Sequence, residues 1–142
     1  MKIRLSQIPP EGVVLREVTS ARELDLETEI VSFNAPLTIV ATVERITNAV
    51  TVRARVSGSR RFFCSRCLEE FDSALHKILT VSYRVSPSDR MLDIGPDIRE
   101  EIILDYPLQP LCSPQCKGLC ARCGENLNKG GCRCATTKEK TL

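Results

Sequence analysis

Residues 112–134 read Cys112-Ser-Pro-Gln-Cys116-Lys-Gly-Leu-Cys120-Ala-Arg-Cys123-Gly-Glu-Asn-Leu-Asn-Lys-Gly-Gly-Cys132-Arg-Cys134, and they hold six of the chain's eight cysteines. The other two, Cys64 and Cys67, form a C-x2-C pair far upstream. Such close-spaced pairs are typical of zinc sites, because four thiolates supply the tetrahedron that Zn²⁺ prefers. Four pairs predict two zinc ions per chain. The stretch has almost no apolar side chains beyond Leu119 and Leu127, so we expect metal to hold it together.

The spacing leaves the pairing of the cysteines open. We prefer one site of Cys64, Cys67, Cys112 and Cys116, and a second of Cys120, Cys123, Cys132 and Cys134. The preferred first site would fix the later segment to the upstream part of the fold. In the alternative, the upstream pair combines with Cys120 and Cys123 instead. A one-residue spacer makes chelation by both Cys132 and Cys134 tight, which leaves open whether both bind.

Disulfides and an iron–sulfur cluster are the alternatives to zinc. An even number of cysteines in a small chain fits a disulfide framework. The start, Met1-Lys-Ile-Arg-Leu-Ser6, has no apolar stretch long enough for export, so we expect a bacterial cytoplasm in which thiols stay reduced. Iron–sulfur clusters also take four thiolates. A glycine-supported turn such as Cys120-x2-Cys123-Gly124 is more typical of zinc.

The rest of the chain predicts a small sheet with an aliphatic core. Hydrophobic residues make up 42% of the 142 residues, tryptophan is absent, and no run of 18 apolar residues predicts a membrane span. Apolar and polar residues alternate with a period of two, which favours antiparallel strands with one buried face. Strands are expected at 3–8, 13–18, 37–44, 50–57 and 79–85. Turns are expected at 9–12 and 47–49, and a turn or bulge at Ser57-Gly58-Ser59.

Two capping-box patterns predict helices. Ser20–Glu23 would open a short helix through Asp25 to Glu29, after which the sheet begins. Asp97–Glu100 would open a helix of about ten residues that ends before Pro107, after a polar loop at 86–96.

The expected fold class is therefore α+β, mainly an antiparallel β meander or partial barrel with one or two short helices and a C-terminal cysteine-rich zinc module. Residues 1–111 would form the β domain, with its helix near 97–106. Residues 112–134 would pack on it as a zinc module that shares ligands with Cys64 and Cys67, and residues 135–142 would be a flexible tail.

Positive charge is concentrated near both groups of cysteines, although the net charge is only +2. Residues 45–66 carry six arginines and no acidic residue, and residues 112–142 carry six basic and two acidic residues. This distribution indicates a polyanionic partner. It also fits compensation of thiolate charge around zinc, and charge alone does not separate the two explanations.

No constellation of catalytic residues is visible. The single histidine, His76, and the adjacent pairs Glu69-Glu70 and Glu100-Glu101 look like surface groups. Sites made of four cysteines are closed and structural, whereas catalytic zinc keeps an open position. We therefore expect no enzymatic activity, no catalytic residues and no small-molecule substrate.

Three motifs taken together resemble one known family. They are Cys64-Ser-Arg-Cys67-Leu-Glu-Glu-Phe71; Asp97-Ile-Arg-Glu-Glu-Ile-Ile-Leu104 followed by Pro107 and Pro110; and Cys112-x3-Cys116-Lys-Gly-Leu-Cys120-x2-Cys123-Gly-x-Asn126-Leu-Asn128 closed by Cys132-x-Cys134. The set is similar to the YceD family of large-ribosomal-RNA-subunit accumulation proteins of bacteria and plastids. The resemblance covers roughly residues 34–134.

The resemblance implies a non-enzymatic factor that supports accumulation of the large-subunit ribosomal RNA, hence ribosome biogenesis. Its implied partner is that rRNA or a pre-ribosomal particle. Family members that lack the final cysteine cluster but keep the first pair favour the preferred pairing, and they imply that the site at 120–134 is the dispensable one.

Direct RNA contact is our own inference from charge, since Lys and Arg bind phosphates without reading sequence. The candidate RNA-binding residues are Arg53, Arg55, Arg60, Arg61, Arg66, Lys117, Arg122, Lys129 and Arg133. Phe62 or Phe63 would add a stacking face. The alternative function is a protein–protein adaptor for a ribosomal protein or assembly factor, docking through the helix at 97–105 or a sheet edge, with purely structural zinc. A thiol redox sensor is a third possibility.

Overall fold

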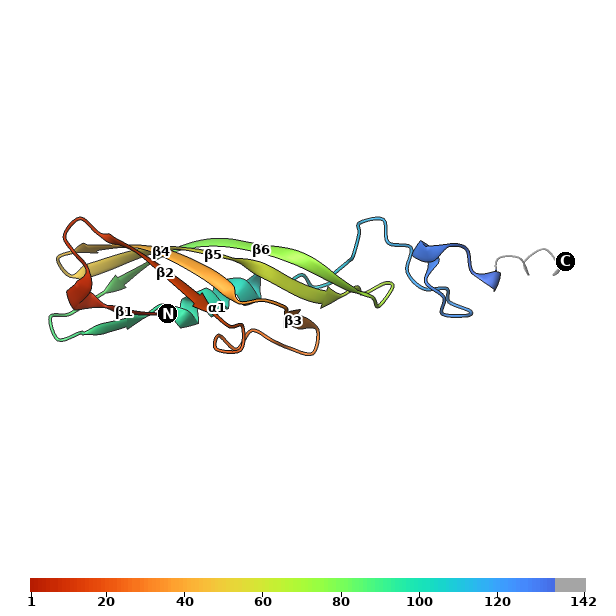
Figure 1. Ribbon diagram of the computed structural model, residues 1–142, viewed down its shortest axis with the longest axis horizontal. Coiled ribbons are helices and arrows are strands. Elements are labelled where there is room, and N and C mark those ends of the chain that lie inside the picture. Colours follow the sequence, from red (N-terminus) through yellow and green to blue (C-terminus); the bar gives the residue numbers. More distant parts are fainter. Residues whose placement is uncertain (135–142) are drawn as a thin grey trace.

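The main sheet is antiparallel, and its two longest strands are neighbours. A computed structural model describes residues 1–134, so the predicted flexible tail at 135–142 lies outside the described residues. The strands of this sheet are β2 Val13–Thr19, β3 Val31–Phe33, β4 Leu37–Ile46, β5 Ala49–Phe63 and β6 Glu70–Arg84. β4 lies between β2 and β5, while β5 pairs with β6 along its whole length. The predicted α+β class is confirmed, and the sheets in the described part of the chain are open (Figure 1).

β5 continues through Ser57-Gly58-Ser59, so the predicted turn or bulge there is wrong. Gly58 pairs with Leu75 in regular register. A Cβ atom at Gly58 would lie 2.4 Å from Cδ2 of Leu37, which is completely buried. The glycine therefore marks a close approach of two neighbouring strands. Because the strand is not interrupted, β5 and β6 carry the turn that contains Cys64 and Cys67 out to the far end of the sheet (Figure 1).

A second, two-stranded sheet pairs β1 (Lys2–Arg4) with β7 (Met91–Asp93). β1 is followed by the 3-10 helix η1 (Leu5–Gln7), so only the start of the predicted strand at 3–8 is extended. The predicted loop at 86–96 likewise contains a strand. The turn predicted at 9–12 is confirmed, since Gly12 has φ 84° and its N–H donates to the Pro9 carbonyl at 3.0 Å.

The capping box at Ser20 and Glu23 forms, but the helix predicted after it does not. The two residues exchange backbone-to-side-chain hydrogen bonds of 3.2 and 3.3 Å. The chain then turns at Asp25, whose φ of 50° is left-handed and stops a right-handed helix. The turn buries Leu26 completely in the core. Burial of an apolar side chain outweighs the local helix signal here.

The predicted second helix is confirmed as α1, Gly95–Leu104. It begins earlier than the capping-box pattern indicates, because the Gly95 N–H donates to the Asp93 carboxylate at 3.0 Å. Ile98 and Ile102 are completely buried in the same core cluster as the apolar residues of β4, β5 and β6. Figure 1 shows α1 alongside the main sheet. α1 has ten residues, and within residues 1–134 no helix has the length and apolar character needed to span a membrane.

Candidate metal centres

The eight cysteines form two separate groups of four. Cluster 1 contains Cys64, Cys67, Cys112 and Cys116, and cluster 2 contains Cys120, Cys123, Cys132 and Cys134. Within each cluster every Sγ atom lies within 4.8 Å of the others. Of the two pairings left open by the sequence, the structure has the preferred one, and both Cys132 and Cys134 belong to cluster 2.

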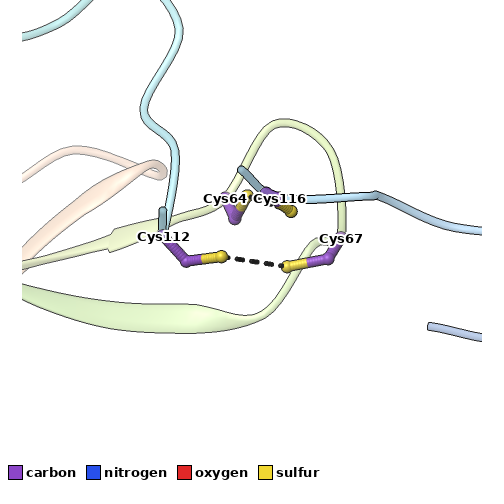
Figure 2. Close-up of side chains that lie close together, drawn as sticks. All are labelled: Cys64, Cys67, Cys112 and Cys116. Carbon is purple, nitrogen blue, oxygen red and sulfur yellow. Dashed lines mark hydrogen bonds between the residues drawn. The ribbon is translucent and has the colours of Figure 1, made fainter. Parts of the chain in front are cut away.

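Cluster 1 joins the β5–β6 turn to the chain that follows α1. Figure 2 shows the two pairs of thiols facing each other, with Cys112 opposite Cys67. The Sγ–Sγ distances are 3.7 Å for Cys64–Cys116 and 3.7 Å for Cys67–Cys112. Cys64, Cys67 and Cys116 are buried, whereas Cys112 is exposed. Two parts of the chain that are far apart in sequence therefore meet at this cluster.

The turn at Cys64 is a zinc-knuckle-like loop closed by backbone hydrogen bonds. The Cys64 N–H donates to the Glu69 carbonyl at 2.8 Å, and the Leu68 N–H donates to the Cys64 carbonyl at 2.9 Å. Leu68 has φ 62°, a left-handed conformation that is unusual for a side chain with a Cβ atom. This tight turn brings both thiols of the C-x2-C pair to the same side.

The turn at Cys120 repeats that pattern in cluster 2. The Cys120 N–H donates to the Glu125 carbonyl at 2.8 Å, and the Gly124 N–H donates to the Cys120 carbonyl at 2.9 Å. Gly124 has φ 74° and occupies the position that Leu68 has in the first turn. The Arg122 N–H points back to the Cys120 sulfur at 3.5 Å. The turn thus directs a backbone N–H group toward the sulfur of its first cysteine.

The segment that leads from α1 into cluster 1 is held against the first turn. Both the N–H and the hydroxyl of Ser65 donate to the Pro110 carbonyl at 2.8 Å. The Arg66 guanidinium donates to the Cys116 carbonyl at 3.0 Å. Gly118, with φ 78°, would bring a Cβ atom within 3.3 Å of the Arg66 carbonyl. These contacts place Cys112 and Cys116 opposite the first pair.

Asn128 links the two clusters, and sequence reasoning gave it no role. Its amide Nδ2 donates to the Cys116 sulfur at 3.2 Å, and its Oδ1 accepts the Lys117 N–H at 2.8 Å. Asn128 lies in the 3-10 helix η2 (Leu127–Lys129), which comes shortly after the turn at Cys120 in cluster 2. The asparagines in the Cys123-Gly-x-Asn126-Leu-Asn128 motif are the signal that points to this contact.

Backbone N–H groups favour one thiolate in each cluster. The N–H groups of Cys123 and Arg122 lower the pKa of Cys120 to about 6. Burial opposes ionisation of Cys64, but N–H groups from Cys67, Cys112 and Arg66 outweigh it and lower its pKa to about 6. Burial and the neighbouring thiols raise the pKa of Cys112. Because adjacent thiolates repel one another, four of them ionise together only around a cation.

The sulfur positions fit a tetrahedral metal ion. A metal with bonds to sulfur of about 2.3 Å places its ligands about 3.8 Å apart. The Sγ–Sγ distances of 3.7 Å in cluster 1 and 3.4 Å for Cys120–Cys132 in cluster 2 are close to that value. They are far longer than a disulfide bond of about 2.05 Å. Each cluster can therefore bind one metal ion through four thiolates.

Arg60 departs from its expected role as an RNA-binding residue. Its side chain is only 8% exposed, and its Nη2 pairs with the Asp105 carboxylate at 2.8 Å. The guanidinium also lies 5.2 Å from the centre of the Phe62 ring and 5.9 Å from that of Tyr106. The alternation of β5 turns Arg60 inward and its neighbour Arg61 outward. Arg60 is thus a structural residue, and we leave it out of the proposed RNA surface.

Several of the other predicted basic residues are already paired. Arg61 binds the Asp72 carboxylate at 2.8 Å, and Lys129 forms an ion pair with Glu69. Arg66 is engaged with the Cys116 carbonyl. Lys117 directly follows Cys116 of cluster 1, whereas Arg122 and Arg133 lie between the cysteines of cluster 2. Phe62 is buried and Phe63 is 45% exposed, so only Phe63 is open for stacking.

Arg53 and Arg55 are exposed on the outer face of the main sheet, as the period of two predicts. The strand register places Arg16, Val40, Arg55 and Ile78 in one row across β2, β4, β5 and β6. Arg53 lies in the adjacent row, and neither row contains an acidic residue. Sequence reasoning missed Arg16, although the alternation of the predicted strand at 13–18 puts it on this face.

The fold and the clusters define a class of protein: a small α+β protein with two clusters of four cysteines, each able to bind a metal ion, next to one end of its sheet. A model of the family described as large ribosomal RNA subunit accumulation protein YceD matches residues 83–141. The match spans α1 and the six distal cysteines. No solved structure matches this chain.

Relatives are found in mycobacteria and in plants. An uncharacterised protein of Mycobacterium leprae is 24% identical over 127 residues, which are 79% of this chain and 58% of the relative. One of Mycobacterium tuberculosis is 30% identical over 122 residues, 75% of this chain and 59% of the relative. The large ribosomal RNA subunit accumulation protein YCED homolog 1, chloroplastic, of Zea mays is 46% identical over 48 residues, 33% of this chain and 16% of the relative.

The match over residues 83–141 and the plant relatives support membership of the YceD family and bear out the resemblance inferred from the three motifs. It spans a little over half the length of the mycobacterial relatives and a much smaller share of the plant ones.

Proposed function

We propose that this protein is a zinc-containing, non-enzymatic factor that supports accumulation of the large-subunit rRNA by binding rRNA or pre-ribosomal particles. The observation that carries the proposal is the pair of four-thiolate clusters in a chain of the YceD family. The plant relatives are named for large ribosomal RNA subunit accumulation. The role in ribosome biogenesis is transferred from those names to this chain.

Zinc is the metal we assign to both clusters. All eight ligands are thiolates, and the turns at Cys64 and Cys120 donate backbone N–H groups toward sulfur. This donor set and geometry are typical of structural zinc. A metal ion with four protein ligands has no open position for a substrate, so the role of the metal in this proposal is structural.

The outer face of the sheet is the RNA surface that we favour. Arg16, Arg53 and Arg55 stand there in two neighbouring rows without an acidic residue. Val40 and Ile78 lie between and beside the arginines, and a hollow of about 210 Å³ opens between Arg53 and Arg55. Guanidinium groups bind phosphates and stack on bases, so such a face suits the backbone and unpaired bases of RNA.

An adaptor that binds a ribosomal protein or assembly factor is the alternative. Leu104 at the end of α1 is 72% exposed, and Leu108 beyond it is fully exposed. The two leucines offer an apolar contact surface, and Leu104 lies within about one helical turn of Glu100 and Glu101. An interface of this kind depends little on salt, whereas RNA binding weakens steeply as salt rises.

The test is to measure binding of transcribed large-subunit rRNA fragments at several salt concentrations. The variant Arg53→Gln/Arg55→Gln should bind more weakly than the wild type. Its salt slope should fall by about 0.7 for each phosphate of single-stranded RNA that the protein no longer neutralises. Zinc content should stay unchanged, since neither arginine contacts a cluster.

The matched control is Arg22→Gln/Arg99→Gln, which removes the same charge from two exposed, ion-paired arginines outside the sheet. The control should bind RNA like the wild type. Equal RNA affinity and equal salt slopes for the two double variants would remove the outer face from the proposal. Binding of a ribosomal protein that is insensitive to salt and abolished by Leu104→Ser would favour the adaptor.

A further inference from the structure

A hollow lined by three arginines lies at the end of the main sheet that is far from the cysteine clusters. Its volume is about 610 Å³, and Arg4, Arg45 and Arg90 line it. They come from β1, from β4 and from the loop before β7, which meet at one end of the sheet, while the cysteine-rich segment extends from the other (Figure 1). This site is therefore separate from the clusters and from the outer face with Arg53 and Arg55.

The hollow is held together by the backbone of one buried residue. Leu5 is 2% exposed, and its N–H donates to the Arg90 carbonyl at 3.0 Å. Its own carbonyl accepts a hydrogen bond from Nη1 of Arg45 at 3.2 Å. The β1–β7 register places Arg4 opposite Met91, next to Arg90. Three separate segments are thus fixed around a common space.

The charge of the hollow is unbalanced. Within residues 1–134, Arg4, Arg45 and Arg90 form no ion pair with a carboxylate. Among the described residues Asp89 is the single acidic one in the lining, and it accepts the Ser86 N–H within its own loop at 2.8 Å. Three guanidinium groups therefore share one space with a single carboxylate, which leaves an excess of positive charge. A concave surface of one sign also focuses its field on an incoming ion of the opposite sign.

We propose that this hollow is a binding site for phosphate groups. The planar guanidinium donates two parallel hydrogen bonds to phosphate oxygens, and three of them around one space suit a ligand with more than one phosphate. A volume of about 610 Å³ lies within the usual range of about 300–1,000 Å³ for ligand pockets. The phosphates belong either to an RNA backbone or to a small phosphorylated ligand.

The probe for the test is inorganic tripolyphosphate, titrated into the full, metal-loaded chain at moderate salt. Wild-type protein should bind it, and Arg90→Gln should weaken binding roughly tenfold, as expected when a charge-assisted hydrogen bond is removed. Arg90 is exposed and its side chain makes no ion pair in the described part of the chain, so the variant should fold. Arg4→Gln is the second variant, and it should have the same effect.

The control is Arg22→Gln, which removes an arginine that is 86% exposed and lies outside the hollow. It should bind tripolyphosphate like the wild type. No binding by the wild type, or equal binding by all the variants, would overturn the proposal.

Competition by a 20-nucleotide RNA separates the two sources of phosphate. If RNA displaces tripolyphosphate and Arg90→Gln also weakens RNA binding, the site takes an RNA backbone. If RNA does not compete, the site takes a small phosphorylated ligand. Arg53→Gln/Arg55→Gln should keep its affinity for tripolyphosphate in both cases, so failure of the outer face as an RNA surface leaves this proposal intact.

Discussion

Asn128 connects the two clusters, because it lies in the chain between Cys123 and Cys132 of cluster 2 and its side chain reaches cluster 1. Its amide N–H donates to the Cys116 sulfur, and its side-chain carbonyl accepts the Lys117 N–H. The hydrogen bond from Asn128 is the largest contribution that lowers the pKa of Cys116. An N–H donor beside a thiolate stabilises the charged form, which is the form that binds metal. Asn128 therefore tunes cluster 1 from outside its set of ligands.

Replacing Asn128 by Asp should weaken metal binding at cluster 1. The change exchanges an N–H donor for a negative charge next to Cys116, and removal of such a supporting hydrogen bond typically lowers metal affinity about 10–100-fold. Competition with a coloured chelator measures the effect. Asn48→Asp, in the exposed β4–β5 turn, adds the same charge far from both clusters and should leave metal affinity unchanged. Equal weakening in the two variants would contradict the role of Asn128.

Arg60 and Asp105 form the shortest of the ion pairs between the sheet and the end of α1, at 2.8 Å. Asp105 also accepts a hydrogen bond from Lys77 at 3.2 Å. Two nitrogens of the Arg60 guanidinium, Nε and Nη1, are buried without a hydrogen-bond partner in the described part of the chain. The carboxylate is thus the main compensation for a charge that is removed from water.

Asp105→Asn should destabilise the protein by about 2–3 kcal/mol, because it leaves the buried Arg60 without a carboxylate. Burial raises the pKa of Asp105, but hydrogen bonds from Arg60 and Lys77 outweigh it, so the pKa is lowered. A lowered pKa contributes stability above the ordinary value near 3.8, and this contribution disappears as pH falls through the folded-state pKa. The difference between variant and wild type should therefore shrink below about pH 4.

The control is Asp72→Asn, which breaks the exposed pair with Arg61 and should cost less than about 1 kcal/mol. Denaturant unfolding at neutral and acidic pH measures both variants. Equal destabilisation by the two substitutions would show that burial of Arg60 has no energetic consequence.

At the scale of elements, the close packing of β4 against β5 depends on Gly58. Gly58→Ala should cost about 1–3 kcal/mol, since the new methyl group would meet the buried Leu37 at 2.4 Å. Ser59→Ala, one residue further on the same strand and facing outward, should change stability by less than about 0.5 kcal/mol. Thermal unfolding of both variants checks this. A neutral Gly58→Ala would mean that Leu37 moves aside without loss of packing.

Strands, helix and cysteine clusters could be predicted from the sequence to different degrees. The alternation at 37–44 and 50–57 predicts most of β4 and the first half of β5, because one buried face imposes a period of two. The turn predicted at Gly58 does not form. Glycine is common both in turns and where two strands approach closely, and the sequence alone does not distinguish the two cases. The helix expected after Ser20–Glu23 fails because tertiary burial of Leu26 overrides a local signal.

The same distinction holds for the sites. Cysteine spacing predicts the ligands, since a metal ion needs close pairs, and the structure adds their grouping. The charge pattern identifies candidate RNA-binding arginines, but it does not show whether their side chains face the core or the solvent. Arg60 and Arg61 are neighbours in a basic stretch, yet the Arg60 side chain is 8% exposed and that of Arg61 is 37% exposed. The contacts of Asn128 and the hollow with Arg4, Arg45 and Arg90 depend on segments that only the folded chain brings together.

On the scale of the whole molecule, the core and the metal centres are separate sources of stability. The apolar core between the sheet and α1 contains no cysteine among the described residues, whereas a second small cluster groups Cys64, Cys67 and Cys116 with Phe71 and Leu111. We propose that residues 112–134 behave as a module that needs metal, while the sheet folds through its own core.

Removal of metal by a chelator or by acid should therefore open residues 112–134 and leave the sheet folded. Acid acts because protonated thiols release the metal. Trypsin should then cleave after Lys117, Arg122 and Lys129, which metal protects in the loaded protein. The strand signal in circular dichroism should persist. Unfolding of the whole chain on chelation would contradict this separation.

Metal content of the full chain, purified without chelators, tests the central claim of two four-thiolate zinc centres most directly. We predict two zinc ions per chain in the wild type, and one in each of Cys64→Ser/Cys67→Ser and Cys120→Ser/Cys123→Ser. The retained ion in each variant would show that each cluster holds its own ion when the other is empty. A wild-type chain without metal, with its cysteines oxidised to disulfides, or both double variants losing all zinc, would contradict the account.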